Sequence, residues 1–262
     1  MSDTPLKVLA FGHSHMGAVQ RAWMRRNRAE QAPFDARFIR LSLEQFQPNF
    51  ETLGGKRQTA KALDRRMAHM IRSEAPDVVL CALMGNEASS VSMLRHPQPF
   101  DFAWAPYGFE VEPGTTAVPF DVMKATMRDL AENNALALWR SISQAAKASQ
   151  TPVVLMLPPP PIESEEHIRR FPGAFQKRVK QFGVSPALFR YKIWMLYCEV
   201  MKEAVAGTGT VVVEPPLEAL DEGYLGQSYW SEDPTHGNID YGDLMIDKLR
   251  TEIFPPLIKQ PA

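Results

Sequence analysis

Three short polar segments carry the residue types that acyl-transfer chemistry needs. The first is Phe11–Gly17, where Ser14 stands between two histidines directly after a short apolar run. A serine at the carboxyl end of a strand and beside a helix N-terminus suits a nucleophile, because the free N–H groups of the helix favour the negative charge that attack generates. The alternative is that Ser14 only caps the helix that follows.

The second segment is Asp233–Asn238, which reads Asp-Pro-Thr-His-Gly-Asn. A serine hydroxyl needs a base to remove its proton, and a histidine base needs an acceptor that holds its tautomer. We therefore expect Asp233 and His236, three residues apart, to meet side by side. Taken alone, the segment is also an ordinary turn sequence.

The third segment, Met84–Glu87, follows the most apolar run of the chain. An asparagine at the end of a strand can aim its side-chain N–H₂ group at a developing oxyanion, which is the role we consider for Asn86. Gly85 would allow the backbone to approach closely, although a simple turn is the alternative. All three segments fall where a parallel sheet collects catalytic groups, and their coincidence favours a site.

The elements that must position these segments follow a regular alternation. Four short apolar runs are typical of buried parallel strands: residues 7–11, 77–84, 152–157 and 210–213. A fifth strand is expected over residues 36–42, where apolar and polar residues alternate loosely. Between them, apolar residues recur at helical spacing, as in Met123, Met127, Leu130 and Ile142, which we expect to share one helical face. The pattern predicts an α/β protein, a flavodoxin-like three-layer α/β/α sandwich with a five-stranded parallel sheet.

Two stretches do not fit the alternation. Residues 87–119 are rich in proline and aromatic residues without a clear period, and residues 158–184 open with four prolines. Both follow strands, at the sheet edge where ligand-binding loops lie. We interpret them as excursions that shape a pocket within a single domain covering residues 1–262.

Composition excludes several classes of protein. The 262 residues are 45% hydrophobic and carry a formal net charge of -1, which argues against disorder and against a dedicated nucleic-acid binder. No apolar run approaches the roughly 20 residues of an integral membrane segment, and no secretory leader is recognisable, so we expect a cytoplasmic protein. The two cysteines form no framework or zinc motif, and we expect no metal or other cofactor. Oligomeric state is left open.

Together the three segments resemble the SGNH hydrolase (GDSL esterase/lipase) superfamily, over nearly the whole chain. The resemblance implies that Ser14 is the nucleophile, His236 the general base and Asp233 its orienting partner. It also implies an oxyanion hole formed by the backbone N–H of Ser14, the side chain of Asn86 and a glycine N–H after the second strand. That glycine is Gly54 or Gly55, with Gly55 favoured.

The chain departs from the family pattern at three positions. His13 stands where the family has aspartate before the serine, Met84 stands where it has glycine, and Glu87 replaces the aspartate that usually follows the asparagine. These departures bear on the subfamily and the substrate rather than on the nucleophile.

Other residues have two interpretations each. His13 and His15 form a His-x-His pair that supplies metal ligands in amidohydrolases, but that fold needs eight strand–helix units and only five strands are predicted. We instead expect His15, with Tyr229 and Trp230, to line the substrate pocket, ordinary packing being the alternative for the two aromatic residues.

A basic stretch interleaved with phenylalanines is either a solvated face or a site for an anionic substrate or lipid headgroup; it comprises Arg169, Arg170, Lys177, Arg178 and Lys180 with Phe171, Phe175 and Phe182. Cys81 and Cys198 are expected to be buried thiols.

The function predicted from these observations and the resemblance is a serine-dependent esterase. It would hydrolyse a small or carbohydrate acyl ester through an acyl-enzyme. Two alternatives stay open: an acyltransferase that passes the acyl group to a sugar hydroxyl, and a catalytically silent module that binds glycans or acyl groups.

Overall fold

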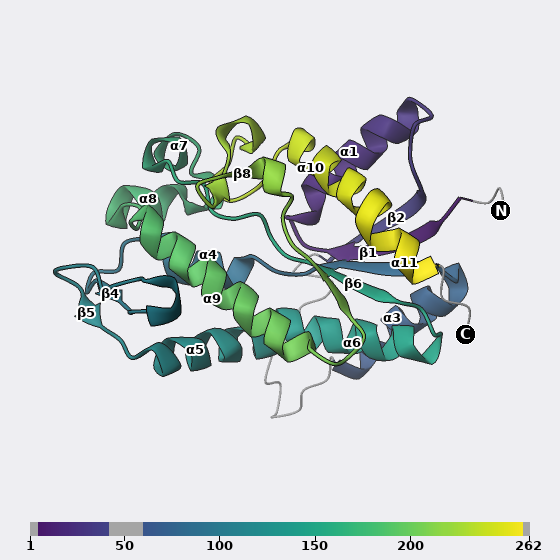
Figure 1. The fold of residues 1–262 in the computed structure, drawn as a ribbon, viewed down its shortest axis with the longest axis horizontal. Helices are drawn as coiled ribbons and strands as arrows, with labels where there is room; N and C mark the ends of the chain where they lie inside the picture. The colour runs from purple at the N-terminus through teal and green to yellow at the C-terminus, as the bar shows by residue number, and fades with distance from the viewer. Residues whose placement is uncertain (1–4, 42–59, 259–262) are drawn as a thin grey trace.

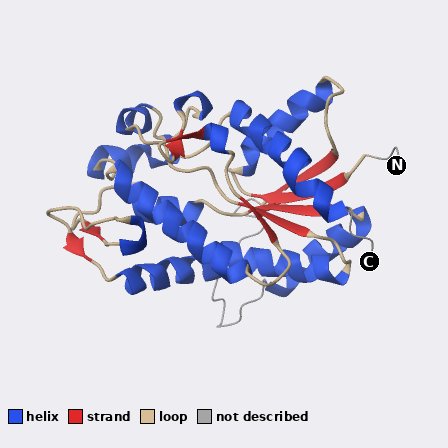
Figure 2. Cartoon of the chain, in the orientation of Figure 1, coloured by secondary structure: helices blue, strands red, loops and turns tan. Residues whose placement is uncertain are grey.

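A five-stranded parallel sheet forms the centre of the computed structural model, which describes residues 5–41 and 60–258 (Figures 1 and 2). The strand order is β2-β1-β3-β6-β7. The strands are β1 (Lys7–Gly12), β2 (Asp35–Arg40), β3 (Val78–Ala82), β6 (Val153–Met156) and β7 (Val211–Val213). This is the flavodoxin-like order, and it confirms the predicted fold class.

The strand register brings the functional segments to one edge. Gly12, the last residue of β1, is level with Arg40 on β2 and with Ala82 on β3. The chain leaves β1 toward β2 on one side and later returns to β3 on the other, so the order reverses between β1 and β3. Ligands of open α/β sheets bind at such a switch point, beyond the carboxyl ends of the strands.

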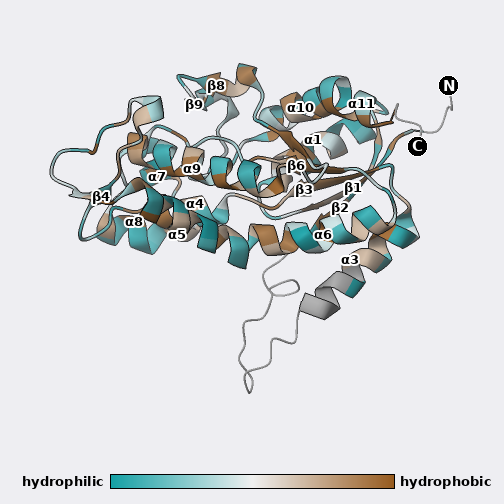
Figure 3. Ribbon diagram, turned by 60° about the horizontal axis from the view of Figure 1, so that its bottom comes forward, coloured by the Kyte–Doolittle hydropathy of each residue, from teal (hydrophilic) through white to brown (hydrophobic). Residues whose placement is uncertain are grey.

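Helices cover both faces of the sheet, as Figures 1 and 3 show. One face packs against α1 (Met16–Arg28), α10 (Ile239–Lys248) and α11 (Phe254–Ile258), the last two joined by a π-helical segment, Leu249–Ile253. The other packs against α3 (Ala60–Glu74), α6 (Ala135–Ala148) and α9 (Ala187–Val205), with α5 (Phe120–Asn133) beside them. In the described part of the chain, no helix combines the length and apolar composition needed to span a bilayer.

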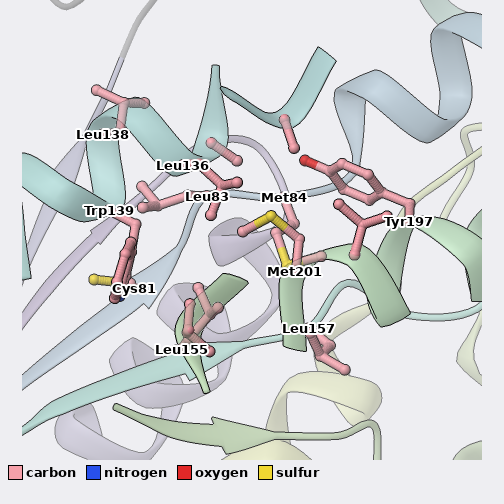
Figure 4. Close-up of a cluster of buried hydrophobic side chains, with 14 of the residues drawn as sticks. Cys81, Leu83, Met84, Leu136, Leu138, Trp139, Leu155, Leu157, Tyr197 and Met201 are labelled. Carbon is pink, nitrogen blue, oxygen red and sulfur yellow. The ribbon is translucent and has the colours of Figure 1, made fainter. Parts of the chain in front are cut away.

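The alternation of side chains along β1 divides the core in two. Val8 and Ala10 belong to the cluster under α1, whereas Leu9 and Phe11 belong to the cluster under α6 and α9. Figure 4 shows part of this second cluster, where Cys81 of β3 lies among side chains of β6, α6 and α9. Cys81 and Cys198 are buried free thiols, as predicted, and burial raises the pKa of both.

One expectation about the helices is wrong. The apolar positions from Met123 to Ile142 do not lie on one continuous helix, because α5 ends at Asn133 and α6 begins at Ala135. Asn134 between them has φ −133° and ψ −96°, and its side-chain amide donates to the carbonyl of Leu130. The chain therefore bends at a residue whose side chain satisfies the end of the first helix.

The two excursions fold against each other beyond the carboxyl edge of the sheet (Figure 1). The first contains α4 (Asn86–Ser92), β4 (Phe100–Asp101) and β5 (Thr116–Ala117), and the second contains α7 (Glu165–Arg170) and α8 (Gln176–Phe182). Leu94 and Val184 form an antiparallel bridge between them, and Ile168 and Val179 pack with Met93. A small hairpin, β8 (Leu220–Asp221) and β9 (Tyr224–Leu225), completes this end of the molecule.

A buried ion pair fixes the first excursion to α9. The ammonium group of Lys192 lies 2.7 and 2.8 Å from the two carboxylate oxygens of Asp101 and 3.1 Å from the carbonyl of Glu110. The side chains of Lys192 and Asp101 are 0% and 4% exposed. Because both charges are removed from water, each one offsets the desolvation cost of the other, and removing one leaves a buried charge without a partner.

Replacing Lys192 by methionine should lower the free energy of unfolding by about 3–5 kcal/mol, because Asp101 is left buried without its partner. The exposed pair of Lys202 and Glu214 supplies a matched control, and Lys202→Met should cost about 1 kcal/mol or less. Urea denaturation followed by circular dichroism measures both. Equal losses in the two variants would show that the Lys192–Asp101 pair does not hold the excursion.

Candidate active site

The turn after β1 holds Ser14 at the switch point of the sheet. The backbone N–H of His13 donates to the carbonyl of Ala82 on β3, at 3.0 Å. The ring of His13 donates from Nδ1 to the carbonyl of Leu41, just after β2, at 2.8 Å. Gly12 is packed so closely that a Cβ atom there would lie 2.8 Å from the carbonyl oxygen of Ala82. The turn is thus fixed to both neighbours of β1.

Ser14 is not the N-cap of α1. The N-cap position is His15, and no side-chain hydrogen bond caps the helix. Ser14 instead lines a cavity of about 190 Å³ together with Asp233 and His236. The structure therefore gives no support to a capping role and places the three residues predicted for the triad around one space.

Asp233 and His236 form the hydrogen-bonded pair that their spacing predicts. Oδ1 of Asp233 is 2.9 Å from Nδ1 of His236 and also accepts the backbone N–H groups of Thr235 and His236, both at 2.8 Å. Burial alone would raise the pKa of Asp233, but the hydrogen bond and charge of His236 and the two backbone donors outweigh it and hold that pKa below its ordinary value. The carboxylate is therefore ionised beside the ring.

This pairing sets the tautomer of His236. With the Nδ1 proton donated to Asp233, Nε2 carries the lone pair that can accept a proton. His236 Nε2 is buried and has no hydrogen-bond partner among the described residues, so the bond from Ser14 is not made in this structure. Catalytic hydrogen bonds of this kind can tighten only when substrate binds.

The loop that carries Asp233 and His236 is framed on both sides. Trp230 and Gly237 form an antiparallel bridge, and Asn238 caps α10 by accepting the backbone N–H groups of Asp240 and Tyr241. His167 of α7 donates from Nε2 to the carbonyl of Ser231, at 2.9 Å. The second excursion thus supports this loop, a role that sequence reasoning missed because one histidine in a helical stretch carries no signal.

Tyr229 and Trp230 support the loop that carries Asp233 and His236 and do not line the cavity of Ser14. Both pack against the core under α1 and α10, and the indole N–H of Trp230 donates to the carbonyl of Leu225 at 2.6 Å. These contacts are those of ordinary packing, and a contact of either residue with substrate stays a prediction.

His15 packs against the candidate base, His236, and against Gly85 just before α4. Its ring centroid is 4.5 Å from that of His236, and a Cβ atom on Gly85 would lie 2.2 Å from its Nε2. Burial, and then the charge of His236, lower the pKa of His15 to about 3, so the ring is neutral at physiological pH. His15 also lines a small pocket, of about 30 Å³, with Thr235, Trp194 and Arg190.

The His-x-His pair does not converge on a common point in a way that suits a metal. His13 uses Nδ1 on a backbone carbonyl, and His15 is turned against Gly85 and His236. Within residues 5–41 and 60–258, no group of three or more His, Cys, Asp or Glu side chains is arranged to hold a metal ion.

The structure describes only part of the predicted oxyanion hole. Gly54 and Gly55 lie outside the described residues. Asn86 is the first residue of α4 and is exposed, and it is not among the residues that line the cavity of Ser14. Gly85 just before it has φ +117°, a conformation that glycine adopts readily and that here lets His15 pack against the backbone.

Glu87 turns away from the cavity, which gives the departure from the family pattern a structural role. It is 5% exposed, and its Oε1 accepts the backbone N–H of Ala135 at the start of α6, at 3.3 Å. Burial raises the pKa of Glu87. The carboxyl group thus ties α4 to α6 inside the core.

The basic stretch of the second excursion is a largely exposed surface. Ile168 and Val179 of α7 and α8 are buried, whereas the arginines and lysines between them face solvent. Arg169 pairs with Glu165, and the guanidinium of Arg170 lies 5.2 Å from the ring centre of Phe171. None of these residues lines the cavity of Ser14.

Comparisons with known proteins identify the fold. No protein-family model matches the sequence. A search of curated proteins finds no match. The periplasmic domain of a lipopolysaccharide acetyltransferase from Salmonella ser. Paratyphi A superposes with a TM-score of 0.52 at 11% identity, over 97% of this chain and 85% of that one. The chain therefore shares the fold of that acetyltransferase domain.

Other solved structures that the chain resembles carry names of the same kind. A GDSL-like lipase from Bacteroides thetaiotaomicron has a TM-score of 0.47 at 14% identity, covering 95% of this chain and 88% of that one. A family 3 carbohydrate esterase from Clostridium thermocellum has a TM-score of 0.41 at 12% identity, covering 96% of both chains. Identities of 14% and 12% do not establish a shared reaction, so the chemistry has to be argued from the site.

Gly85→Ala should destabilise the protein and displace His15. Alanine is strained at φ +117°, and its Cβ atom would collide with the His15 ring. Gly114→Ala is the matched control, because Gly114 also has a positive φ, +82°, but no atom lies within 4 Å of the added Cβ. We expect Gly85→Ala to cost about 2 kcal/mol more than the control in urea denaturation. Equal costs would show that His15 is not held against Gly85.

Asp233→Asn should change how stability depends on pH. The folded-state pKa of Asp233 lies below its unfolded value of about 3.9, so its carboxylate stabilises the fold above that value, and the contribution is lost as the pH falls through the folded-state pKa. The difference in unfolding free energy between the wild type and Asp233→Asn, about 1 kcal/mol at neutral pH, should shrink below about pH 4.

Urea denaturation at a series of pH values measures this difference. Asp129→Asn, exposed on α5, changes the net charge equally and serves as the control. A difference that stays constant down to pH 2 would mean that the Asp233–His236 hydrogen bond does not stabilise the folded protein.

Proposed function

We propose that this protein is a serine-dependent acyl hydrolase of the SGNH type, acting on a small or carbohydrate acyl ester. The observation that carries the proposal is the hydrogen bond from His236 Nδ1 to Asp233, which leaves an unpartnered Nε2 beside a cavity that Ser14 also lines. An oriented base next to a serine at a helix N-terminus is the arrangement that nucleophilic catalysis requires.

In the proposed reaction, Ser14 Oγ attacks the acyl carbonyl carbon while its proton passes to Nε2 of His236. The carboxylate of Asp233 stabilises the imidazolium that forms. The tetrahedral intermediate collapses, the alcohol leaves with the proton from His236, and the acyl group remains on Ser14. A water molecule then attacks the acyl-enzyme with His236 again as base, which releases the acid and restores Ser14.

The oxyanion of each intermediate would be held by the backbone N–H of Ser14 and by the side chain of Asn86, with Gly55 as the third donor. The start of α1 favours this, because unpaired N–H groups at a helix N-terminus attract negative charge. Asn86 is exposed at the start of α4, and its role requires that its amide reach the cavity when substrate binds.

Transfer of the acyl group to a sugar hydroxyl is the second candidate. The fold shared with a lipopolysaccharide acetyltransferase domain favours this alternative. The same acyl-enzyme serves both reactions, and only the acceptor differs. Adding a polyol or an oligosaccharide to a turnover assay distinguishes them, because a transferase diverts acyl groups from water to the sugar. A silent binding module would need neither Asp233 nor the orientation of His236.

Ser14→Ala should abolish hydrolysis of short p-nitrophenyl esters, because removing the nucleophile of a serine hydrolase can lower kcat by about 10⁶-fold. A fluorophosphonate probe should label the wild type on the peptide that contains Ser14, as mass spectrometry can establish. Ser231→Ala is the control, since Ser231 lies in the same loop as Asp233 and uses its backbone carbonyl to accept from His167. Activity of Ser14→Ala within tenfold of the wild type, at unchanged thermal stability, would contradict the proposal.

A further inference from the structure

Two arginines that the proposed reaction does not use line the cavity of Ser14. Arg21 comes from α1, and Arg40 is the last residue of β2. They share this space of about 190 Å³ with Ser14 and His236, and both residues are exposed to solvent at its rim. Their charges therefore act on whatever molecule reaches the serine.

The guanidinium of Arg21 is directed back along α1 toward the serine turn. Arg21 stands one helical turn after Gly17, and a Cβ atom on Gly17 would lie 3.2 Å from Nη1 of Arg21. The absence of a side chain at residue 17 leaves the room that the guanidinium occupies. Gly17 is itself only three residues from Ser14, and its backbone N–H donates to the carbonyl of Ser14 at 2.9 Å.

Arg40 reaches the same edge from the neighbouring strand. It is level with Gly12 in the parallel pairing of β1 and β2. Gly12 ends β1 just before His13 and Ser14, so Arg40 and the serine turn lie at the same end of adjacent strands. The two arginines thus come from different elements and converge on one cavity.

Among the described residues that line the cavity there is one acidic residue, and its single negative charge offsets only one of the two arginine charges. Asp233 lines the cavity, but its Oδ1 is committed to His236 and to two backbone N–H groups. Across the described ranges, 5–41 and 60–258, no carboxylate forms an ion pair with Arg21 or Arg40. The cavity wall therefore carries a positive charge that favours an anion beside the nucleophile.

We propose that Arg21 and Arg40 bind an anionic group, a carboxylate or a phosphate, on the ester that Ser14 attacks. The proposal rests on the proposed acyl-transfer function and narrows its substrate class to anionic esters. Guanidinium groups suit this task because their planar forks donate paired hydrogen bonds to carboxylate or phosphate oxygens. Neutral esters would still react at Ser14, with lower kcat/KM.

The test compares esters that differ in charge and little in shape. 4-Carboxyphenyl acetate carries an anion, 4-carbamoylphenyl acetate is its neutral counterpart, and 4-acetoxyphenyl phosphate carries a phosphate. Each kcat/KM value is divided by the rate constant for hydrolysis by hydroxide, which corrects for the leaving group. The ratio for either anionic ester to the neutral one then measures recognition of the anion, and comparing the two anionic esters tells which oxyanion the site prefers.

We expect the wild type to favour an anionic ester, and Arg21→Gln and Arg40→Gln each to lower that preference about three- to tenfold. Added sodium chloride should lower it as well. Turnover of the neutral ester should change little in either variant. Arg28→Gln is the matched control, because Arg28 is an exposed arginine at the far end of α1 and does not line the cavity.

The outcomes separate this proposal from the proposed function. Ser14-dependent hydrolysis with equal rates for charged and neutral esters, or equal effects of Arg21→Gln and Arg28→Gln, would overturn the anion site and leave the acyl hydrolase intact. If no ester is turned over, the hydrolase proposal fails. Calorimetric binding of 4-hydroxybenzoate and 4-hydroxyphenyl phosphate to the Ser14→Ala protein, with 4-hydroxybenzamide as the neutral reference, then decides on the anion site alone. Binding of an anion that Arg21→Gln weakens supports the site, and binding that the variant does not change overturns it.

Discussion

One carboxylate oxygen, Oδ1 of Asp233, accepts three hydrogen bonds on which the arrangement of the site depends. Two of them, from the backbone N–H groups of Thr235 and His236, set the turn of the loop, and the third, from His236 Nδ1, sets the tautomer of the candidate base. Backbone conformation and proton position are therefore fixed by the same atom. A carboxylate that accepts several donors stays ionised, and this is what a histidine base needs from its partner.

That loop can hold its geometry only because distant parts of the chain support it. His167 reaches it from the second excursion, and Asn238 anchors its end to α10. The helix α10 in turn lies directly against α1, where Gly242 approaches so closely that a Cβ atom would lie 2.2 Å from the carbonyl oxygen of Ala18. Because α1 begins two residues after Ser14, this contact between α1 and α10 sets the distance between the nucleophile turn and the base loop. Packing on one face of the sheet thus controls geometry at its edge.

All five predicted segments are strands. Four of them are apolar almost throughout, as buried parallel strands are, and β2 at the edge shows the looser alternation of a partly exposed strand. The sequence also predicts the three residues around the cavity, since the carboxyl ends of parallel strands meet at one edge. It predicts side-chain direction less well. Glu87 and Trp230 lie in segments that the sequence places at the site, but their side chains do not line the cavity. The side chain of Glu87 points into the core, and the indole of Trp230 donates to the carbonyl of Leu225. Such choices depend on which partner, here Ala135 or Leu225, the tertiary fold brings near.

Arg21 and Arg40 were missed for the same reason. Arg21 looks like one more charged residue on the outer face of a helix, and Arg40 like a polar residue in an exposed strand. Only the register of β1 with β2 and the small size of Gly17 bring their guanidinium groups to the cavity. Helical spacing alone could have placed Arg21 near the serine turn, because Gly17 and Arg21 are one helical turn apart and share a face. The position of Arg40 depends on the pairing of β1 with β2, which no local sequence pattern predicts.

The burial of His15 keeps a second positive charge from forming beside His236. During acyl transfer His236 takes up a proton. The ring centres of His15 and His236 are 4.5 Å apart, so a positive charge on His15 would oppose that step. Desolvation prevents this, because it lowers the pKa of His15 to about 3 and keeps its ring neutral. The charge that faces the imidazolium is then that of Asp233, which attracts it. Gly85 is what makes this possible, since a side chain at residue 85 would occupy the place of the His15 ring. A glycine just before α4, a neutral histidine and an ionised aspartate thus act together on the proton affinity of one nitrogen atom.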